Sequence, residues 1–389
     1  MPNHFLIRNR LFVLLFSFIF LSACDDPSQI GLDLVDAQAG ETDVVTLPPS
    51  FVGPSEFGDI SGGTNTAGAF RTLFGKVVDP VSGSFSMTGY VDFVNSSNVT
   101  SAFRAETVSF ADLELNVDYA YGDTLTPVTI DIYEIAADWL STDARSDTFL
   151  VAQTLVTSST LNPTKGVVNI ALPSAWVATN NSILRSTSFV DVFHGFAFRA
   201  TQGNAVLGVH FSGSSLRASS VPGDTVNFSM SKILSSSSFA NASETPSYTT
   251  LRDGAAETLA LRFDVEGPDF GEAAFHRVII RLNTENTDAL YPANFAHSSP
   301  TRVGLRAVAV DNSTRLNLVV AELSSDGTLS FDSSILSNVI QSANLGNSGL
   351  DRFELYFPVE SSTVGALAFK KGLPATFGPR AVITYTSLN

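Results

Sequence analysis

The chain has 389 residues, of which 44% are hydrophobic and only 15% charged, with 38 acidic against 22 basic side chains. A formal net charge of −16 argues against binding to nucleic acid or to anionic lipid headgroups, because both attract basic surfaces. The hydrophobic content is sufficient for a large core, and the length predicts two domains rather than one.

The first 23 residues have the pattern of a secretory signal peptide. Arg8 and Arg10 precede the apolar run at residues 11–20, which is too short to span a bilayer. The run leads into Leu-Ser-Ala-Cys, which resembles the bacterial lipobox and contains the only cysteine, Cys24. The resemblance implies cleavage before Cys24 and acylation of this residue, and two or more acyl chains give stable anchoring. The alternative is an ordinary cleaved signal peptide followed by a chance cysteine.

Asp25 and Asp26 directly follow the predicted acylation site. Acidic residues at this place resemble the signal that exports lipoproteins of Bacteroidota to the outer leaflet, whereas in enterobacteria an aspartate there favours retention in the inner membrane. We therefore predict a lipid-anchored outer-membrane protein that faces the cell exterior. Cleavage would remove Arg8 and Arg10 but no acid, so the mature formal charge would be −16 − 2 = −18. Acylation would leave no thiol for a disulfide or a metal site.

The chain after the anchor divides into a polar segment and a β-rich body. Residues 24–66 are rich in Asp, Gly, Pro and Thr, which predicts a flexible tether with one short strand at residues 43–47. In residues 111–119 the odd positions are apolar and the even positions polar, as in an antiparallel strand with one solvated face. Further strands are predicted at residues 127–135, 193–200 and 205–213. Helices are predicted only at residues 174–184 and 333–344.

Three patterns recur in the same order along the chain, which indicates an internal repeat. The paired segments are residues 71–80 with 257–268, 108–118 with 273–285, and 195–213 with 366–387. A serine-rich stretch lies between the two sets. We therefore predict an all-β fold of two tandem antiparallel β-sandwich modules, jelly-roll-like, at residues 67–232 and 250–389, joined by a linker or loop at residues 233–249. The alternative is that strands of unrelated sandwiches look alike.

The centre of the first module is similar to a DNRLRE-type, carbohydrate-binding-like β-sandwich, in which an A-x-L-x-L strand is followed by a V-x-V-Y-x-V strand and a tryptophan. The matching residues are Ala111, Leu113, Leu115, Ile130, Ile132, Tyr133 and Trp139. The whole chain also resembles a Bacteroidota lipoprotein family of unknown function that joins an acylated cysteine, a stretch like residues 26–34 and two such halves. The DNRLRE string itself is absent, so the resemblance rests on loose hydrophobic patterns.

Four common enzyme motifs are absent from the sequence: H-E-x-x-H, the Walker A loop, the G-x-S-x-G elbow and a dinucleotide-type glycine fingerprint after a strand. None of His194, His210, His276 and His297 is three or four residues from another, as a local histidine metal pair would require. We therefore expect no enzymatic activity and no resident cofactor. The carboxylates of Asp112, Glu114, Asp118 and Asp123 have two interpretations: a solvated strand face, or part of a Ca²⁺ site completed by loop oxygens.

Ligand contacts are predicted at two aromatic residues. Tyr121 and Trp176 lie in turn-like sequence and are expected to be exposed, whereas Tyr119 and Trp139 are expected in the core. The leading functional hypothesis is a non-catalytic surface lipoprotein that contacts the lipid bilayer through Cys24 and binds an extracellular ligand such as a polysaccharide. The alternative is a structural or assembly component of the envelope that contacts other surface proteins.

Overall fold

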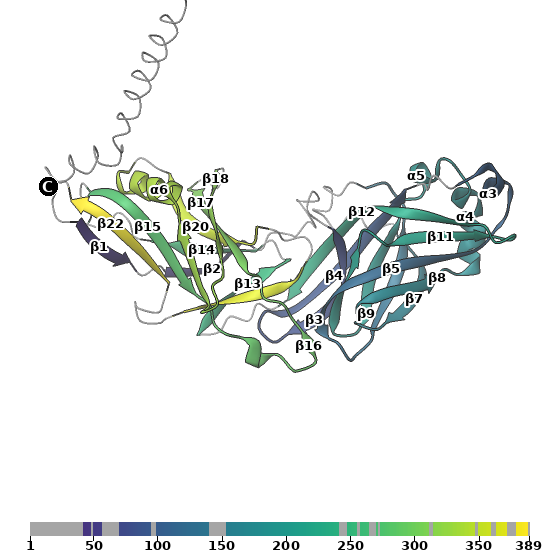
Figure 1. Cartoon of the computed structure of the whole chain (residues 1–389), viewed down its shortest axis with the longest axis horizontal. Coiled ribbons are helices and arrows are strands. Elements are labelled where there is room, and N and C mark those ends of the chain that lie inside the picture. Colours follow the sequence, from purple (N-terminus) through teal and green to yellow (C-terminus); the bar gives the residue numbers. More distant parts are fainter. Residues whose placement is uncertain are drawn as a thin grey trace, which may run out of the picture.

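The computed structural model describes residues 42–47, 50–56 and 70–387, with gaps at 95–98, 140–152, 241–246, 255–256, 264–269, 271–272, 311–313, 347–348, 359–362 and 372–378. In these ranges the chain is mostly antiparallel β-strand with a few short helices, which confirms the all-β class. The strands form two bodies that lie end to end along the long axis of the molecule (Figure 1). Each has its own hydrophobic core.

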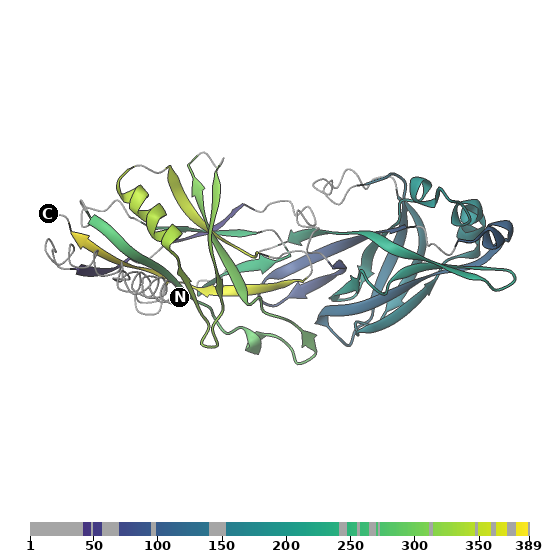
Figure 2. The same cartoon turned by 45° about the horizontal axis from the view of Figure 1, so that its top comes forward.

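The first body, called module 1, comprises the described residues from 70 to 240. Its strands are β3 (Arg71–Asp79), β4 (Gly83–Val94), β5 (Val108–Asp123), β6 (Val128–Ile135), β7 (Gln153–Leu161), β8 (Gly166–Ala171), β9 (Phe196–Gln202), β10 (Ala205–His210), β11 (Ser215–Ser220) and β12 (Thr225–Ala240). Three short helices, α3 (Ser101–Ala105), α4 (Ser174–Leu184) and α5 (Phe189–Val192), lie at the end of module 1 far from the other body (Figures 1 and 2). The start and end of α4 match the helix predicted at residues 174–184.

Strand β12 connects the two sides of the module 1 sheet. Its first residues pair with β11, and from Ser229 to Ala240 it pairs with β4. This long pairing corrects the expectation of a serine-rich linker at residues 233–249, because the part up to Ala240 is strand. Serine side chains are small enough to pack on a sheet, and their hydroxyls can bond to it: the backbone N–H of Leu73 donates to Oγ of Ser235 at 2.7 Å.

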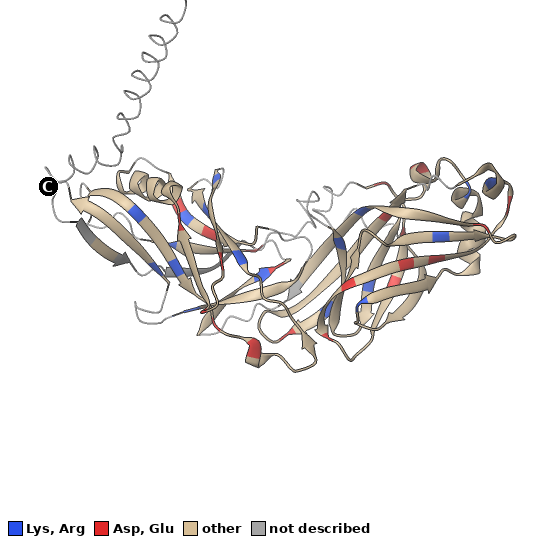
Figure 3. Cartoon of the chain, viewed as in Figure 1, with Lys and Arg blue, Asp and Glu red and all other residues tan. Residues whose placement is uncertain are grey.

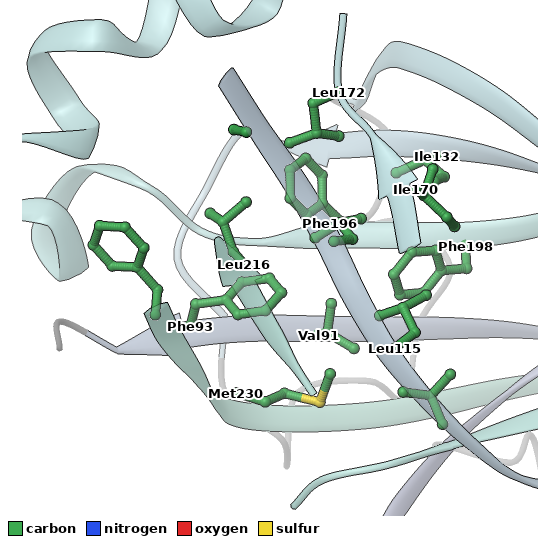
Figure 4. Packing of buried hydrophobic residues seen from close by; sticks show 14 of the residues in the cluster. Val91, Phe93, Leu115, Ile132, Ile170, Leu172, Phe196, Phe198, Leu216 and Met230 are labelled. Carbon is green, nitrogen blue, oxygen red and sulfur yellow. The ribbon is translucent and has the colours of Figure 1, made fainter. Parts of the chain in front are cut away.

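The core of module 1 is rich in phenylalanine. Phe196 and Phe198 of β9 are fully buried and lie among Leu115 of β5 and Ile132 of β6 (Figure 4). Burial of one such side chain contributes about 1.5–3 kcal/mol relative to its exposure. The alternating odd positions of β5 from Ala111 to Val117 all point into this core, as the sequence pattern predicts.

The second body, called module 2, is built from two main sheets, a separate two-stranded pair and one α-helix. Its strands are β1 (Thr42–Leu47), β2 (Ser50–Glu56), β13 (Tyr248–Asp253), β14 (Thr258–Arg262), β15 (Ala273–Asn283), β16 (Phe295–Ala296), β17 (Arg302–Ala309), β18 (Arg315–Glu322), β19 (Thr328–Asp332), β20 (Leu350–Tyr356), β21 (Gly365–Lys370) and β22 (Arg380–Ser387). The sheet order is β1-β22-β15-β19 in one layer and β18-β17-β20-β14-β2 in the other, with β13 and β21 as a separate pair. Helix α6 (Ser334–Asn344) packs on β15, and Ser333 caps its N-terminus through a bond from the N–H of Leu336. This helix lies in the segment predicted at residues 333–344.

Module 1 is inserted into module 2. Strand β1 pairs with β22 from Thr42–Thr386 to Leu47–Ala381, and β2 pairs with β14. The chain therefore contributes two strands to module 2, builds module 1, and then returns to complete module 2. This corrects the tandem arrangement, and it shortens the tether expected at residues 24–66, because residues 42–47 and 50–56 are strands of module 2. The short strand predicted at residues 43–47 is confirmed as β1.

The two modules share a topology. Four pairings of module 1, β6–β7, β6–β9, β5–β8 and β5–β10, have counterparts in the same chain order in module 2: β17–β18, β17–β20, β15–β19 and β15–β22. A helix follows β8 in module 1 and β19 in module 2. The two halves therefore repeat one arrangement of strands.

The strands that correspond in the structure are not all the ones that the three sequence matches pair with each other. Residues 108–118 and 273–285 do correspond, as β5 and β15. However, β9 corresponds to β20 rather than to β21, because β20 is the neighbour of β17. Strand β14 takes the position of β4 beside β20, and β1 takes the position of β3 beside β22. The hairpin β3–β4 is thus replaced in module 2 by strands from either side of the insertion.

Candidate ligand-binding surface

A β-bulge at Asp118 reverses the two faces of β5. Val117 pairs with Val209 and faces the module 1 core, but the next pair is Tyr119 with Gly208. Because one extra residue inverts the alternation, Tyr119 and Tyr121 point to the outer face of the sheet instead of the core. They belong to a separate apolar cluster there, with Phe295 and Val364 of module 2. Tyr119 is therefore buried, as expected, but between the modules rather than in the sandwich.

Tyr121 is buried at the contact between the modules, which corrects the expectation that it is exposed. Only 1% of it is accessible, its ring packs edge-on against Phe295, and its hydroxyl donates to Oδ2 of Asp79 at 2.5 Å. Burial and the nearby Asp79 raise the pKa of the Tyr121 hydroxyl, so it remains a proton donor. The ring has no exposed face for a ligand.

Trp176 is also buried, again contrary to expectation. It is the third residue of α4, its ring packs against Phe193 and Phe196, and its indole N–H donates to Oε2 of Glu134 at 2.5 Å. The sequence before α4 is turn-like, but the helix itself packs against β5 and Trp176 is buried there. Trp139, expected in the core, is 1% exposed.

Three carboxylates along β5 are paired with arginines of β11 and β3. Arg217 of β11 forms ion pairs with Asp112 and Glu114, and Arg71 of β3 pairs with Asp118. Basic and acidic positions lie close together on the strands of module 1 (Figure 3). Asp123 instead accepts bonds from Thr126 and from the amide of Asn294, which hold its pKa below the usual range. Within the described ranges no group of three or more His, Cys, Asp or Glu side chains is placed to hold a metal ion. These oxygens have protein partners, which favours the interpretation as a paired strand face over a Ca²⁺ site.

The four body histidines lie in separate surroundings. His276 contacts the hydroxyl of Thr386 at 2.6 Å, and His297 stacks on Tyr291 with ring centroids 3.9 Å apart. His194 precedes β9, and its Nδ1 is buried without a hydrogen-bond partner among the described residues. These four histidines therefore do not gather in one site.

The contact between the modules is built from strand pairing and polar bonds. Strand β16 of module 2 pairs with the end of β5 through Phe295 and Asp123. The hydroxyl of Tyr119 donates to the carbonyl of Val364 at 2.8 Å and accepts from its N–H at 3.0 Å. Burial raises the pKa of Tyr119 to about 12. These bonds hold the outer face of β5 against module 2. The side chains that border this contact form its rim.

At this rim lies the group that we call the Arg71 cluster: Phe70, Arg71, Asp118, Tyr119 and His210. The Arg71 guanidinium donates to both carboxylate oxygens of Asp118, at 3.0 and 2.7 Å, and lies 4.4 Å from the ring centre of Phe70 and 5.1 Å from that of Tyr119. The ring of Phe70 is 5.6 Å from His210. Gly208 makes room for this arrangement, since a Cβ there would lie 2.7 Å from Cδ of Arg71 and 2.8 Å from Cβ of Tyr119.

The cluster exposes aromatic surface. Phe70 is 43% accessible, and the neighbouring Phe211, whose N–H donates to the carbonyl of Phe70, is 39% accessible. The ring of His210 is oriented by its own loop: its Nδ1 lies 3.0 Å from the backbone nitrogen of Ser212 and 3.1 Å from the carbonyl oxygen of the same residue. An apolar ring face therefore lies beside an oriented imidazole and a fixed ion pair.

Sequence patterns did not single out this cluster, although strands were predicted at the positions of β5 and β10. Phe70, Asp118 and His210 are 48 to 140 residues apart, and only the neighbouring positions of β3, β5 and β10 in the sheet bring them together. The one local signal is the pair Phe70-Arg71 at the start of the repeated segment 71–80. Cys24, Asp25 and Asp26 lie outside the described residues. Among the helices that the structure does describe, none is long and apolar enough to cross a membrane.

No protein-family model matches the chain, and no curated protein matches it. Among solved structures, the chain is similar to a protein from the Bacteroidota species Parabacteroides distasonis that is described as secreted, with 8% sequence identity and a TM-score of 0.21. The alignment covers 89% of this chain and 99% of the other. A TM-score this low establishes neither a common fold nor a common function. Membership of the DNRLRE-type or Bacteroidota lipoprotein families accordingly stays a hypothesis.

Proposed function

We propose that this protein is a non-catalytic lipoprotein of the outer membrane that binds an extracellular polysaccharide at the Arg71 cluster. The exposed ring of Phe70 beside the Arg71–Asp118 pair carries this proposal. Sugar rings stack their C–H faces on aromatic rings and place their hydroxyls against polar side chains, and the cluster offers both kinds of group within one patch. The polar side chains are held by hydrogen bonds within the protein, between Arg71 and Asp118 and between His210 and Ser212, so little ordering entropy is lost on binding.

Binding is tested with a glycan array and titration calorimetry on a chain that starts at Asp25. We expect saturable binding that Phe70→Ala weakens about five- to tenfold, since one stacked aromatic ring contributes about 1–1.5 kcal/mol. The double variant Phe70→Ala/Phe211→Ala is expected to bind more weakly still. Both rings are substantially exposed, so these changes should leave the melting temperature almost unchanged.

Phe110→Ala is the matched control, because Phe110 is 45% exposed on β5 but lies outside the cluster. It should bind like the unmodified chain. Equal weakening by Phe110→Ala would contradict the assignment of the site to the Arg71 cluster. Absence of binding to a broad set of polysaccharides would reject the proposed function and leave the assembly component as the working hypothesis.

A specific feature favours that second function, contact with other envelope proteins. Strand β7 is the last strand of its sheet in the described part of module 1, and its sequence contains no charged residue or proline. Leu155 on this strand is 53% exposed. Uncharged edge strands are open to pairing with a strand of another chain.

The lipid anchor is tested by Cys24→Ser. We expect this variant to move from the membrane fraction to the soluble fraction of the envelope, because the serine cannot take the thioether-linked lipid and two or more acyl chains provide the anchoring free energy. The control is Asp25→Ala/Asp26→Ala, which keeps the cysteine and should remain in the membrane fraction. A Cys24→Ser protein that stays with the membrane would show that another feature holds it there.

A further inference from the structure

If the Arg71 cluster binds a polysaccharide, as the proposed function states, the charges of the cluster indicate whether that polysaccharide is neutral or acidic. Arg71 is the one arginine of the cluster, and the Nε–Nη2 edge of its guanidinium is occupied by Asp118. Asp118 accepts two hydrogen bonds from it, and the rings of Phe70 and Tyr119 lie within 4.4 and 5.1 Å. The Arg71 side chain is only 11% accessible. Its charge is thus neutralised inside the protein before any ligand arrives.

The remaining groups of the surface are uncharged or acidic. The accessible parts are the exposed rings of Phe70 and Phe211 and the partly exposed side chains of His210 and Asn116. The amide of Asn116 donates to the carbonyl of Ser212 at 3.3 Å. Asp118 retains 26% accessibility of its side chain, so negative charge reaches the surface more than positive charge does. Across the chain acids outnumber Lys and Arg by 16. A uronate or sulfate group would meet like charge there and find no unpaired arginine within the cluster.

We infer that the Arg71 cluster binds neutral polysaccharides, built of uncharged hexose or pentose units, and rejects uronic-acid and sulfated polymers. An apolar sugar face stacks on Phe70, and hydroxyl groups bond to His210 and to the lone pairs of Asp118 that Arg71 leaves available. Binding of this kind depends little on ionic strength, because no net charge is neutralised.

The test compares neutral polymers (β-glucan, xylan and β-mannan) with acidic polymers (alginate, polygalacturonate and a sulfated galactan) at 50 and 500 mM NaCl. We expect binding to at least one neutral polymer with a dissociation constant that changes less than twofold between the two salt concentrations, and at least tenfold weaker binding to every acidic polymer. Salt-sensitive binding to an acidic polymer by the unmodified chain would overturn the neutral class and leave the proposed function intact. No binding to either class would overturn the proposed function itself.

Asp118→Asn is a second, gain-of-binding test. This change keeps the size of the side chain and one acceptor oxygen but removes the charge that neutralises Arg71. We expect the variant to acquire salt-sensitive binding to an acidic polymer, by at least threefold at 50 mM NaCl. The control is Asp112→Asn, which removes a partner of Arg217 away from the cluster and should not produce this binding. Similar gains in both variants would show that net charge, and not the Arg71 cluster, sets the selectivity.

Discussion

A chain that begins at residue 58 is expected to lose the folded state of module 2 and to keep that of module 1. The deleted residues include β1 and β2, which supply one strand to each sheet of module 2. Six positions of β1 pair with β22, and backbone hydrogen bonds contribute about 0.5–1.5 kcal/mol each. Losing two strands therefore removes several kcal/mol from a typical domain stability of about 5–15 kcal/mol. It also exposes the edges of β22 and β14 to aggregation.

The measurement is limited proteolysis followed by mass spectrometry, together with thermal unfolding. We expect a protease-resistant fragment close to residues 70–240 and rapid cleavage within residues 248–387. A chain that begins at residue 40 is the control and should protect both modules, since it retains β1 and β2. Equal protection of residues 248–387 in the two chains would show that module 2 folds without its N-terminal strands, and the insertion would then have no role in stability.

Asp253→Asn is expected to stabilise the protein at pH 8 by up to about 4 kcal/mol, the second-largest effect we predict. Asp253, at the end of β13, is 5% exposed; one of its oxygens accepts from Oγ1 of Thr363 at 2.6 Å, while Oδ1 has no partner among the described residues. Burial raises its pKa to about 7, against the opposing effect of the Thr363 and Gly254 hydrogen bonds. The ordinary carboxyl pKa is about 3.9, so the difference of about 3 units corresponds to roughly 4 kcal/mol.

The sign of this effect depends on pH. Below about pH 4 the carboxyl is protonated in both the folded and the unfolded chain, so it adds no pH-dependent penalty. Between about pH 4 and 7 the unfolded chain loses the proton first, so stability falls as pH rises, and above about pH 7 the penalty is constant. Asn cannot ionise, so the gain of Asp253→Asn should be present at pH 8 and vanish near pH 4. Urea unfolding at several pH values measures it.

Asp351→Asn is the control of opposite sign. Hydrogen bonds from Arg352 and Arg262 hold the pKa of Asp351 below its usual range, so its contribution is present at neutral pH and is lost as pH falls. The site is partly exposed, and we expect a loss of at most about 1 kcal/mol at pH 8. If Asp253→Asn were less stable than the unmodified chain at pH 8, the carboxylate of Asp253 would have to be stabilised by contacts that the structure does not describe.

Tyr121 and Trp176, the two ligand contacts predicted from sequence, show that local sequence patterns do not predict the burial of a side chain when strand pairing decides it. Tyr121 follows a run of clean alternation, but the bulge at Asp118 lies inside that run and inverts the faces of β5. A bulge is decided by the pairing with β10, which begins more than 80 residues later. The residues next to Trp176 in the sequence do not indicate that it is buried. It lies on α4, and its partners Glu134 and Phe196 come from β6 and β9.

By itself the sequence determined the strand class, the helices at residues 174–184 and 333–344 and the inward face of β5 up to Val117, because periodicity and composition are local properties. It also indicated that the chain repeats one unit, since strand patterns recur in order. Only the tertiary structure decided that module 1 is inserted into module 2, that the serine-rich stretch extends β12, and that Phe70, Arg71, Asp118 and His210 form one surface. Each of these depends on strand pairing between residues far apart in the chain. Pairing is selected by the free energy of the whole packed sheet and therefore leaves no signal in any short segment.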